Sequence, residues 1–325
     1  MTRRNLILIH RSHAERDFRE IAEQVYALDH NITTFCVPAH LDVRIPHAEW
    51  RYPTLTLAMG SDFKLPIKRG PLLKNHQIPK LDQQDILRAH GISTPPALAF
   101  KFGMTLDETV FGEFVVLKPI DLDLTSHGNF VYLFRRARLC SLRHDDLPPD
   151  HPVRKTPQAF MVQRYIHTGT APRHIRVGTF LERPIFCYTI ESKLELPSLD
   201  APDEVLERAP VASNAGERDR RILFEEDAIQ LAEAVHRAFG PIPVLGTDIV
   251  REHSTGKLYV LETNPGGNTW IFSSEIGEGT RTSIGAARGP GGNAEAQGRL
   301  ALIEQFGAFG IVAQTLVAKT RELSA

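Results

Sequence analysis

Two apolar segments near the end of the chain, residues 244–251 and 258–265, constrain its fold more than any other feature. Both are rich in branched apolar, aromatic and threonine residues, and turn-forming residues separate them, so together they predict a β-hairpin. A five-residue loop, His253–Lys257, would place Asp248 directly opposite Glu262, with their Cβ atoms roughly 4.5–5.5 Å apart. Like charges at that separation repel unless a cation lies between them.

The alternation of side chains along a strand places the side chain of Asn264 on the face of Glu262, with Val260 and Leu258 behind them. Two carboxylates and an amide oxygen form an all-oxygen donor set, which suits Mg²⁺ or Mn²⁺ better than zinc. The alternative is a solvated hairpin whose acids are simply exposed.

Length and composition set the class of protein. A chain of 325 residues predicts about two domains, and 42% hydrophobic with 24% charged residues is typical of a soluble globular protein. A formal net charge of -1 favours neither nucleic acid nor an anionic membrane as a partner. No apolar run approaches the ~18 residues that span a bilayer, so we expect a cytoplasmic protein. Cys36, Cys140 and Cys187 lie too far apart in the sequence to indicate a disulfide framework or a thiolate zinc site.

The N-terminal part predicts an open α/β domain covering residues 1–78. A strand at 6–9, a helix at 14–28 and a strand at 33–37 follow one another, and a further strand is expected at 54–58. The stretch between the last two strands is rich in proline and basic residues and favours no single structure.

Residues 79–325 predict the second domain, with a small lid subdomain at about 93–165 and a metal-binding core at about 166–325. Its first helix begins at Lys80 or Asp82 and ends at Gly91. Later periodic segments predict strands at 114–118, 130–134, 159–166, 175–180 and 185–190, and a helix at 225–239.

The C-terminal region is expected to hold a loop and one helix. Five glycines between Ser283 and Gly298 favour a loop, which would serve either as a functional lid or as a disordered connector. The apolar spacing from Leu300 to Leu323 predicts a single long helix.

The order of these features resembles the ATP-grasp superfamily of ATP-dependent carboxylate ligases. The resemblance covers roughly residues 75–275, and its most specific part is the sequence Gly-Thr-Asp248-Ile-Val followed by Leu-Glu262-Thr-Asn264-Pro-Gly. It implies an α/β (α+β) ATP-grasp fold, with an N-terminal pre-ATP-grasp domain, a small lid and a C-terminal antiparallel sheet. It also implies that Asp248, Glu262 and Asn264 hold two Mg²⁺ ions against the phosphates of ATP.

Nucleotide contacts follow from the same resemblance. Lys118 matches the lysine at the end of a lid strand that reaches the α- and β-phosphates, although a strand-end lysine can also extend to water. Lys80 resembles an earlier nucleotide-binding lysine, or is an ordinary residue at a helix start. Gln163, Tyr165 and Ile166 resemble the hinge that clamps adenine, where many members carry Glu in place of Gln163.

Three further residues are implied to take part in the chemistry. Arg176, in His174-Ile-Arg-Val, resembles the family arginine that steadies the γ-phosphate or the acyl phosphate, with His174 replacing the usual acid. Lys193 and Asn214 fit, more loosely, later contacts to the triphosphate. The segment 125–129 takes the place of the loop that covers the phosphates.

The resemblance implies an enzyme that forms carbon–nitrogen bonds. ATP would activate a small carboxylate, such as an amino acid or short peptide, as an acyl phosphate that an amine or thiol attacks, releasing ADP and phosphate. The alternatives are an ATP-dependent phosphotransferase and a non-catalytic ATP-binding module. Thr269, Trp270 and Ser273 are candidate substrate contacts, although an aromatic residue after a turn more often packs in the core. A homodimer is expected from the resemblance alone.

Overall fold

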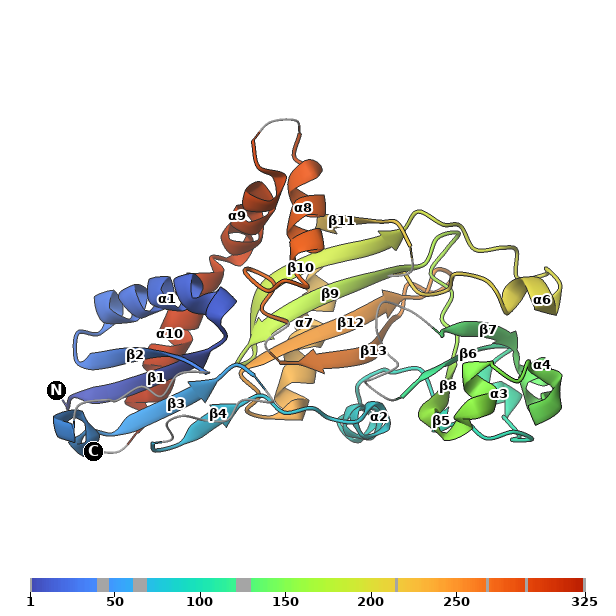
Figure 1. The fold of residues 1–325 in the computed structure, drawn as a ribbon, viewed down its shortest axis with the longest axis horizontal. Helices are drawn as coiled ribbons and strands as arrows, with labels where there is room; N and C mark the ends of the chain where they lie inside the picture. Colours follow the sequence, from blue (N-terminus) through green and yellow to red (C-terminus); the bar gives the residue numbers. More distant parts are fainter. Residues whose placement is uncertain are drawn as a thin grey trace.

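Three sheets organise the computed structural model, which describes residues 2–39, 47–60, 69–120, 130–213, 216–266, 269–289 and 292–323. A five-stranded sheet lies in the middle of the molecule, and the two four-stranded sheets lie at its opposite ends (Figure 1). The predicted N-terminal α/β part, lid part and C-terminal part therefore each contain one sheet.

The N-terminal sheet is parallel and has the strand order β2-β1-β3-β4. Its elements are β1 (Arg4–His10), α1 (Glu15–Leu28), β2 (Ile32–Pro38), β3 (Thr54–Ala58) and β4 (Leu72–Lys74). The central strand β1 is buried from Asn5 to His10, as expected for a parallel strand covered on both faces. The predicted strands at 6–9, 33–37 and 54–58 and the helix at 14–28 are thus confirmed.

The lid sheet is antiparallel and has its own apolar core. Its strands, in the spatial order β5-β8-β6-β7, are β5 (Ala97–Ala99), β6 (Phe114–Pro119), β7 (Tyr132–Arg135) and β8 (Phe160–Arg164). Short helices α3 (Glu108–Phe111), α4 (Arg136–Ser141) and α5 (Pro152–Lys155) accompany them.

The central sheet is antiparallel, and its strand order is β11-β10-β9-β12-β13. Its strands are β9 (Arg173–Phe180), β10 (Arg183–Ser192), β11 (Arg218–Ile222), β12 (Val244–Arg251) and β13 (Leu258–Pro265). The helix α7 (Glu226–Phe239) covers one face, where its apolar side chains pack on Val177, Leu245 and Val260. The helix α2 (Lys80–Ala89) connects to the lid, and α6 (Asp203–Leu206) is a single turn.

The glycine-rich segment is not the loop that its composition predicted. Two helices, α8 (Glu278–Ala286) and α9 (Ala294–Phe306), occupy most of it and project together from the central sheet (Figure 1). A Cβ on Gly285 would lie 1.7 Å from the carbonyl oxygen of Ala294, and one on Gly298 would lie 1.8 Å from that of Arg281. These two glycines therefore allow α8 and α9 to cross closely, which composition alone does not distinguish from a loop.

The expected single C-terminal helix is also two helices. Gly307 adopts a left-handed φ of 66° and separates α9 from α10 (Ala308–Arg321). In the described part of the chain no single helix is long and apolar enough to cross a membrane, and α9 with α10 meets that test only as a pair bent by 48°.

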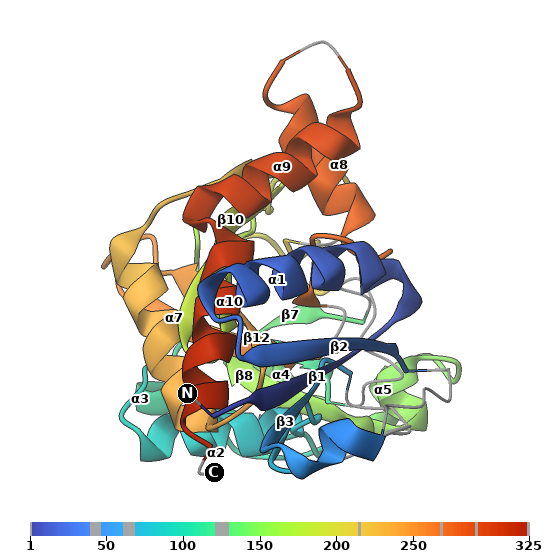
Figure 2. The same ribbon diagram turned by 90° about the vertical axis from the view of Figure 1, so that its left-hand side faces the viewer.

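The second of these helices, α10, returns to the N-terminal sheet and lies beside α1 (Figure 2). Its residues Phe309 and Val312 share a core with Leu6 and Ile21. The core of the N-terminal sheet therefore includes residues of α10. The expected N-terminal domain of residues 1–78 does not contain this helix.

Candidate active site

The hairpin of β12 and β13 places Asp248 directly opposite Glu262, as its sequence predicted. Nearer the turn, Ile249 pairs with Val260 and Arg251 with Leu258, so the hairpin closes there with one residue fewer than the expected five-residue loop. Leu261 is the extra residue of a β-bulge, and it restores the register before Glu262.

The bulge changes which side chains share a face. Val260 packs into the core beneath α7, and Leu261 lines the same cavity as Glu262. The expectation that Val260 lies behind Glu262 is therefore wrong, because strict alternation does not continue through a bulge.

Two glutamines of α2 hold the free edge of β13. The side-chain amide of Gln83 donates to the carbonyl oxygen of Thr263 at 3.1 Å and accepts from its backbone N–H at 2.8 Å. The amide of Gln84 donates to the carbonyl oxygen of Leu261 at 3.3 Å. These contacts flank Glu262 on both sides and satisfy edge groups that would otherwise be left unpaired. The sequence analysis did not single out these glutamines. The feature that could have indicated them is a pair of adjacent amide side chains in the first turns of the helix.

Asp248 is surrounded by hydrogen-bond donors. Arg176 donates from Nε to Oδ1 at 2.6 Å and from Nη2 to Oδ2 at 2.5 Å, and Asn264 donates from Nδ2 to Oδ2 at 3.1 Å. His174 Nε2 lies 3.5 Å from Oδ1, and Nδ1 of the same ring contacts Ser213 Oγ at 2.5 Å. Burial lowers the pKa of Arg176, but the facing Asp248 carboxylate outweighs it and raises that pKa above its usual value.

Glu262 lies among lysines. Lys80 Nζ is 3.2 Å from Glu262 Oε2 and donates to the carbonyl oxygen of Pro119 at 3.2 Å. Burial alone would raise the pKa of Glu262, but the charges of Lys80 and Lys118 lower it to about 2. Burial lowers the pKa of Lys118 to about 8, despite the favourable charge of Glu262. A second anion beside Glu262 would thus meet two desolvated ammonium groups.

A cavity lies between the lid strands and this face of the central sheet, and the two lysines and two acids line it. Gln163, Tyr165 and Ile166, the residues of the predicted nucleotide hinge, line the cavity as well. Gln163 is buried, and its Nε2 has no hydrogen-bond partner among the described residues. A buried amide nitrogen without a partner is costly unless a bound acceptor completes it. Burial also raises the pKa of the Tyr165 phenol to about 12.

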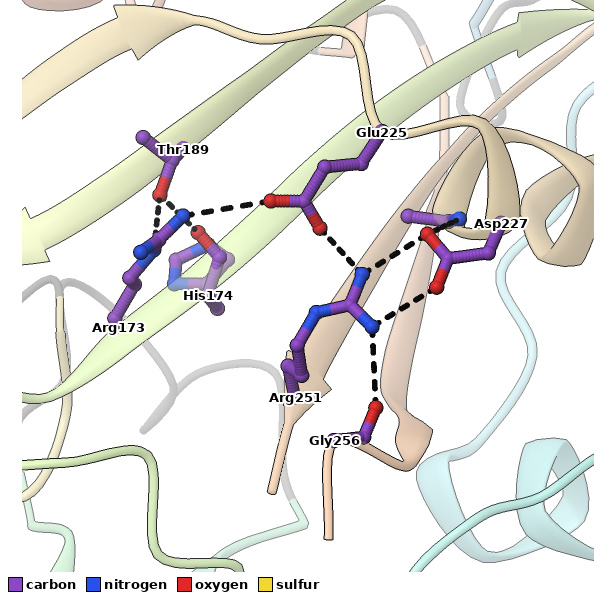
Figure 3. A network of polar contacts seen from close by, with 8 residues as sticks. Arg173, His174, Thr189, Glu225, Asp227, Arg251 and Gly256 are labelled. Carbon is purple, nitrogen blue, oxygen red and sulfur yellow. Dashed lines mark hydrogen bonds and ion pairs between the residues drawn. The ribbon is translucent and has the colours of Figure 1, made fainter. Parts of the chain in front are cut away.

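A network on the opposite face fixes the outer end of the hairpin (Figure 3). Arg251, at the end of β12, donates to Glu225 at 2.6 Å and to both oxygens of Asp227 at 2.9 Å, at the start of α7. Arg173 donates from Nε to Thr189 at 3.1 Å and lies 3.5 Å from Glu225. The strand that carries Asp248 is therefore anchored to the helix behind it.

The remaining predicted site residues lie elsewhere. Lys193 is half exposed, lies 3.6 Å from Glu217 and 3.7 Å from Asp219, and lines a separate cleft. Asn214 and the segment 125–129 fall outside the described residues. Thr269 is buried and donates to the carbonyl oxygen of Asn264 at 2.6 Å, which shapes the turn after β13.

Trp270 is a core residue, and the prediction that it contacts substrate is wrong. Its side chain is 1% exposed, its ring stacks on Phe309, and its Nε1 donates to Asp17 of α1 at 2.8 Å. The apolar surface between the central sheet, α1 and α10 requires a large side chain at this point. Ser273 is half buried, and its hydroxyl has no hydrogen-bond partner within the described residues.

The residues present fit a magnesium ion. Asp248, Glu262 and Asn264 supply two carboxylates and an amide from one face, and that face borders a cavity with two lysines. In the described part of the chain no three His, Cys, Asp or Glu residues are arranged to hold a metal. The site has only two carboxylates, so its third oxygen ligand is the side-chain amide of Asn264. Hard divalent cations prefer such oxygens and are commonly bound by one or two carboxylates together with phosphates.

Comparison with known proteins identifies the fold. No protein-family model matches the sequence, and no curated protein matches it. Among solved structures, the macrocyclase MdnC from Microcystis aeruginosa MRC, bound with the precursor peptide MdnA, matches with a TM-score of 0.52, 11% identity, and coverage of 97% of this chain and 99% of that chain.

Two further structures are similar over almost their full length. The ATP-grasp ligase PsnB, complexed with minimal precursor, Mg and ADP, matches with 13% identity, a TM-score of 0.49 and coverage of 98% of both chains. The D-cycloserine synthetase DcsG matches with 16% identity, a TM-score of 0.47, and coverage of 93% of this chain and 99% of that chain. The chain shares the fold of MdnC, and its parallel N-terminal sheet and two antiparallel sheets confirm the α/β (α+β) class predicted from its sequence.

Proposed function

We propose that this protein is an ATP-dependent ligase that joins a carboxylate to an amine or thiol, releasing ADP and phosphate. The observation that carries the proposal is the opposition of Asp248 and Glu262 on a sheet face that meets Lys80 and Lys118 across one cavity. Both signs of charge are needed there, because a polyphosphate requires cations and a divalent ion requires oxygen ligands.

Each part of the cavity then has a role. Gln163, Tyr165 and Ile166 hold the base, with the unpartnered Nε2 of Gln163 donating to a ring acceptor. Lys118 and Lys80 neutralise phosphate oxygens. Asp248, Glu262 and Asn264 hold Mg²⁺, which supplies charge stabilisation to the transferring phosphoryl group when bound.

Arg176 orients the transferring γ-phosphoryl group and neutralises part of its negative charge. The γ-phosphoryl group passes to a carboxylate oxygen of the substrate, the bond to the β-phosphate oxygen breaks, and ADP leaves. The amine or thiol then attacks the acyl carbon, the bond to the phosphate oxygen breaks, and the acceptor loses its proton to solvent. Such transfers depend mainly on alignment and electrostatics, so no nucleophilic side chain is required.

The test is Mg²⁺-dependent ADP release across a panel of carboxylic acids, with hydroxylamine present to trap an acyl phosphate. Amino acids and short peptides belong in the panel, since MdnC, which has the same fold, was solved with a precursor peptide. Hydroxamate formation with one acid supports the ligase. A phosphorylated acceptor that yields no hydroxamate indicates a phosphotransferase, and nucleotide binding without turnover indicates a binding module.

The Glu262→Gln variant tests the assignment of the metal site. Removing this carboxylate should abolish most Mg²⁺-dependent ADP release, by roughly 100-fold or more, because a charged ligand is lost. Circular dichroism should remain like that of the wild type. Glu23→Gln, at an exposed position on α1, is the matched control and should keep full activity. Normal turnover in folded Glu262→Gln would refute the metal assignment.

A further inference from the structure

Arg220 is a cation on the catalytic face of the central sheet that has no role in the proposed phosphoryl transfer. Arg220 lies on the edge strand β11 and pairs with Ile190 of β10, which in turn pairs with His174 of β9. Directly opposed residues share a face, so Arg220 is on the side that carries Arg176 and Asp248. The strand spacing of ~4.8 Å places the backbone of Arg220 about 10 Å from that of His174.

Among the described residues, the guanidinium of Arg220 has no anionic partner. Its Nε is buried without a hydrogen-bond partner, and no carboxylate of the described residues lies within ion-pair distance of it. Burial lowers its pKa, and the neighbouring positive charges of Arg218 and Arg176 lower it further. The acid next to it in sequence, Asp219, points to the other face by alternation and lies 3.7 Å from Lys193.

Arg220 differs from Arg176 in the partners of its guanidinium group. Both arginines face the same side of one sheet, but Arg176 forms two hydrogen bonds with Asp248. A partly buried guanidinium that repels two others is unfavourable unless an anion binds it. Its planar arrangement of donors matches the two oxygens of a carboxylate.

Arg220 is also accessible to a ligand. It lines a cleft of about 560 Å³ between β11 and α8, and its backbone N–H donates to Ser283 Oγ of α8 at 3.2 Å. The charged residues that line this cleft with Arg220, which is also the cleft of Lys193, are of both signs: Lys193, Arg218, Glu217, Glu275 and Glu278. A ligand with one carboxylate fits this pattern better than a polyanion such as a second nucleotide.

We propose that Arg220 binds the carboxylate of the organic substrate and thereby selects a carboxylate-bearing amino acid or peptide. The identity of the occupant rests on the proposed ligase function, whereas the existence of a carboxylate site does not. Arg220 is thus a specificity-determining residue, at the edge-strand end of the face whose other end holds Asp248 and Glu262.

The test of the site uses N-acetylglycine, a single carboxylate attached to an amide. The thermal unfolding midpoint of the full chain is measured against its concentration at ionic strength held constant with NaCl. The wild-type midpoint should rise by about 2 °C or more at 100 mM, because a ligand that binds only the folded state stabilises it. N-acetylglycinamide, which has no charge, should give no shift.

Variants assign the shift to Arg220. Arg220→Gln should lose it, and Arg220→Lys should keep part of it, because an ammonium retains the charge without the bidentate geometry. Arg221→Gln is the matched control, since Arg221 is the next residue, faces the other side and is 72% exposed in its side chain. Equal shifts in the wild type and Arg220→Gln would overturn the proposed carboxylate site. If the glutamine variant does not fold, Arg220→Lys takes its place, and a full wild-type shift in that variant would overturn the site.

Kinetics separate this proposal from the ligase proposal. For an acid found by hydroxamate trapping, Arg220→Gln should raise its KM at least tenfold and change the KM for ATP less than twofold. An unchanged KM for the acid would overturn the substrate role. An N-acetylglycine shift that depends on Arg220, in a protein that activates no acid, would support the carboxylate site and refute the ligase.

Discussion

Acidification should destabilise this protein through one buried histidine on α7. His236 is 0% exposed, and its ring faces Thr179 of β9. Its Nε2 donates to the carbonyl oxygen of Ile242 at 2.7 Å, and its Nδ1 lies 2.6 Å from the hydroxyl of Thr179. Burial lowers the pKa of His236 to about 4, although the Ile242 carbonyl favours the charged form.

The size of the effect follows from proton linkage. An unfolded histidine has a pKa of ~6.5, so between that value and about 4 the unfolded chain binds a proton that folded His236 does not. The stability it contributes is fully present above ~pH 6.5 and is lost as the pH falls toward the folded value. Between pH 7 and pH 5 the contribution of His236 to the free energy of unfolding should fall by ~2 kcal/mol.

The assay is urea unfolding of the wild type and His236→Gln at both pH values. Glutamine retains a donor and an acceptor but does not titrate, so the variant should be less stable at pH 7 yet lose ~2 kcal/mol less on acidification. His30→Gln, at an exposed position, should show the wild-type pH dependence.

An identical pH dependence in His236→Gln and the wild type would refute the reasoning. It would mean that the pKa of His236 is the same in the folded and the unfolded chain, so that the ring gains its proton over the same pH range in both. In the folded protein at pH 5 the protonated Nδ1 would then donate to Thr179, whose hydroxyl donates to the carbonyl oxygen of Leu245, 3.1 Å away.

Two further predictions concern packing. Trp270→Phe keeps a ring against Phe309 but removes one of the donors to buried Asp17, so thermal or urea unfolding should show a loss of ~1–3 kcal/mol; wild-type stability would contradict the core assignment. Gly285→Ala would place a methyl group 1.7 Å from a backbone oxygen of α9 and should cost ~1–3 kcal/mol or more. Gly279→Ala in the same helix meets nothing within 4 Å and should instead be neutral or gain up to ~1 kcal/mol; similar losses in both glycine variants would refute the close-crossing argument.

The sequence was informative where structure depends on local periodicity. Strand β1, helix α1 and strand β2 were predicted because their apolar residues recur at the spacing of one element. The pairing of Asp248 with Glu262 was predicted for a similar reason, since both lie on one hairpin and a count of residues sets their opposition.

The rest depended on contacts between distant segments. Trp270 looked available for substrate because its partners Asp17 and Phe309 lie far away in sequence. Gly285 and Gly298 have the composition of a loop until two helices cross at them. Arg220 was unremarked because its face is defined only through the registers of four neighbouring strands.

The bulge at Leu261 shows how much of the site depends on one residue. If Leu261 paired regularly, in the register that Ile249 and Val260 set near the turn, then Glu262 would lie opposite Thr247, which is fully buried. Opposed residues share a face, so the carboxylate would point away from the cavity and into the apolar side of the sheet. An ionised carboxylate is costly there, and Lys80 and Lys118 would lose the charge that stabilises them. The bulge at Leu261 therefore shifts the register by one residue between the turn and Glu262, and this shift brings both acids to the lysines.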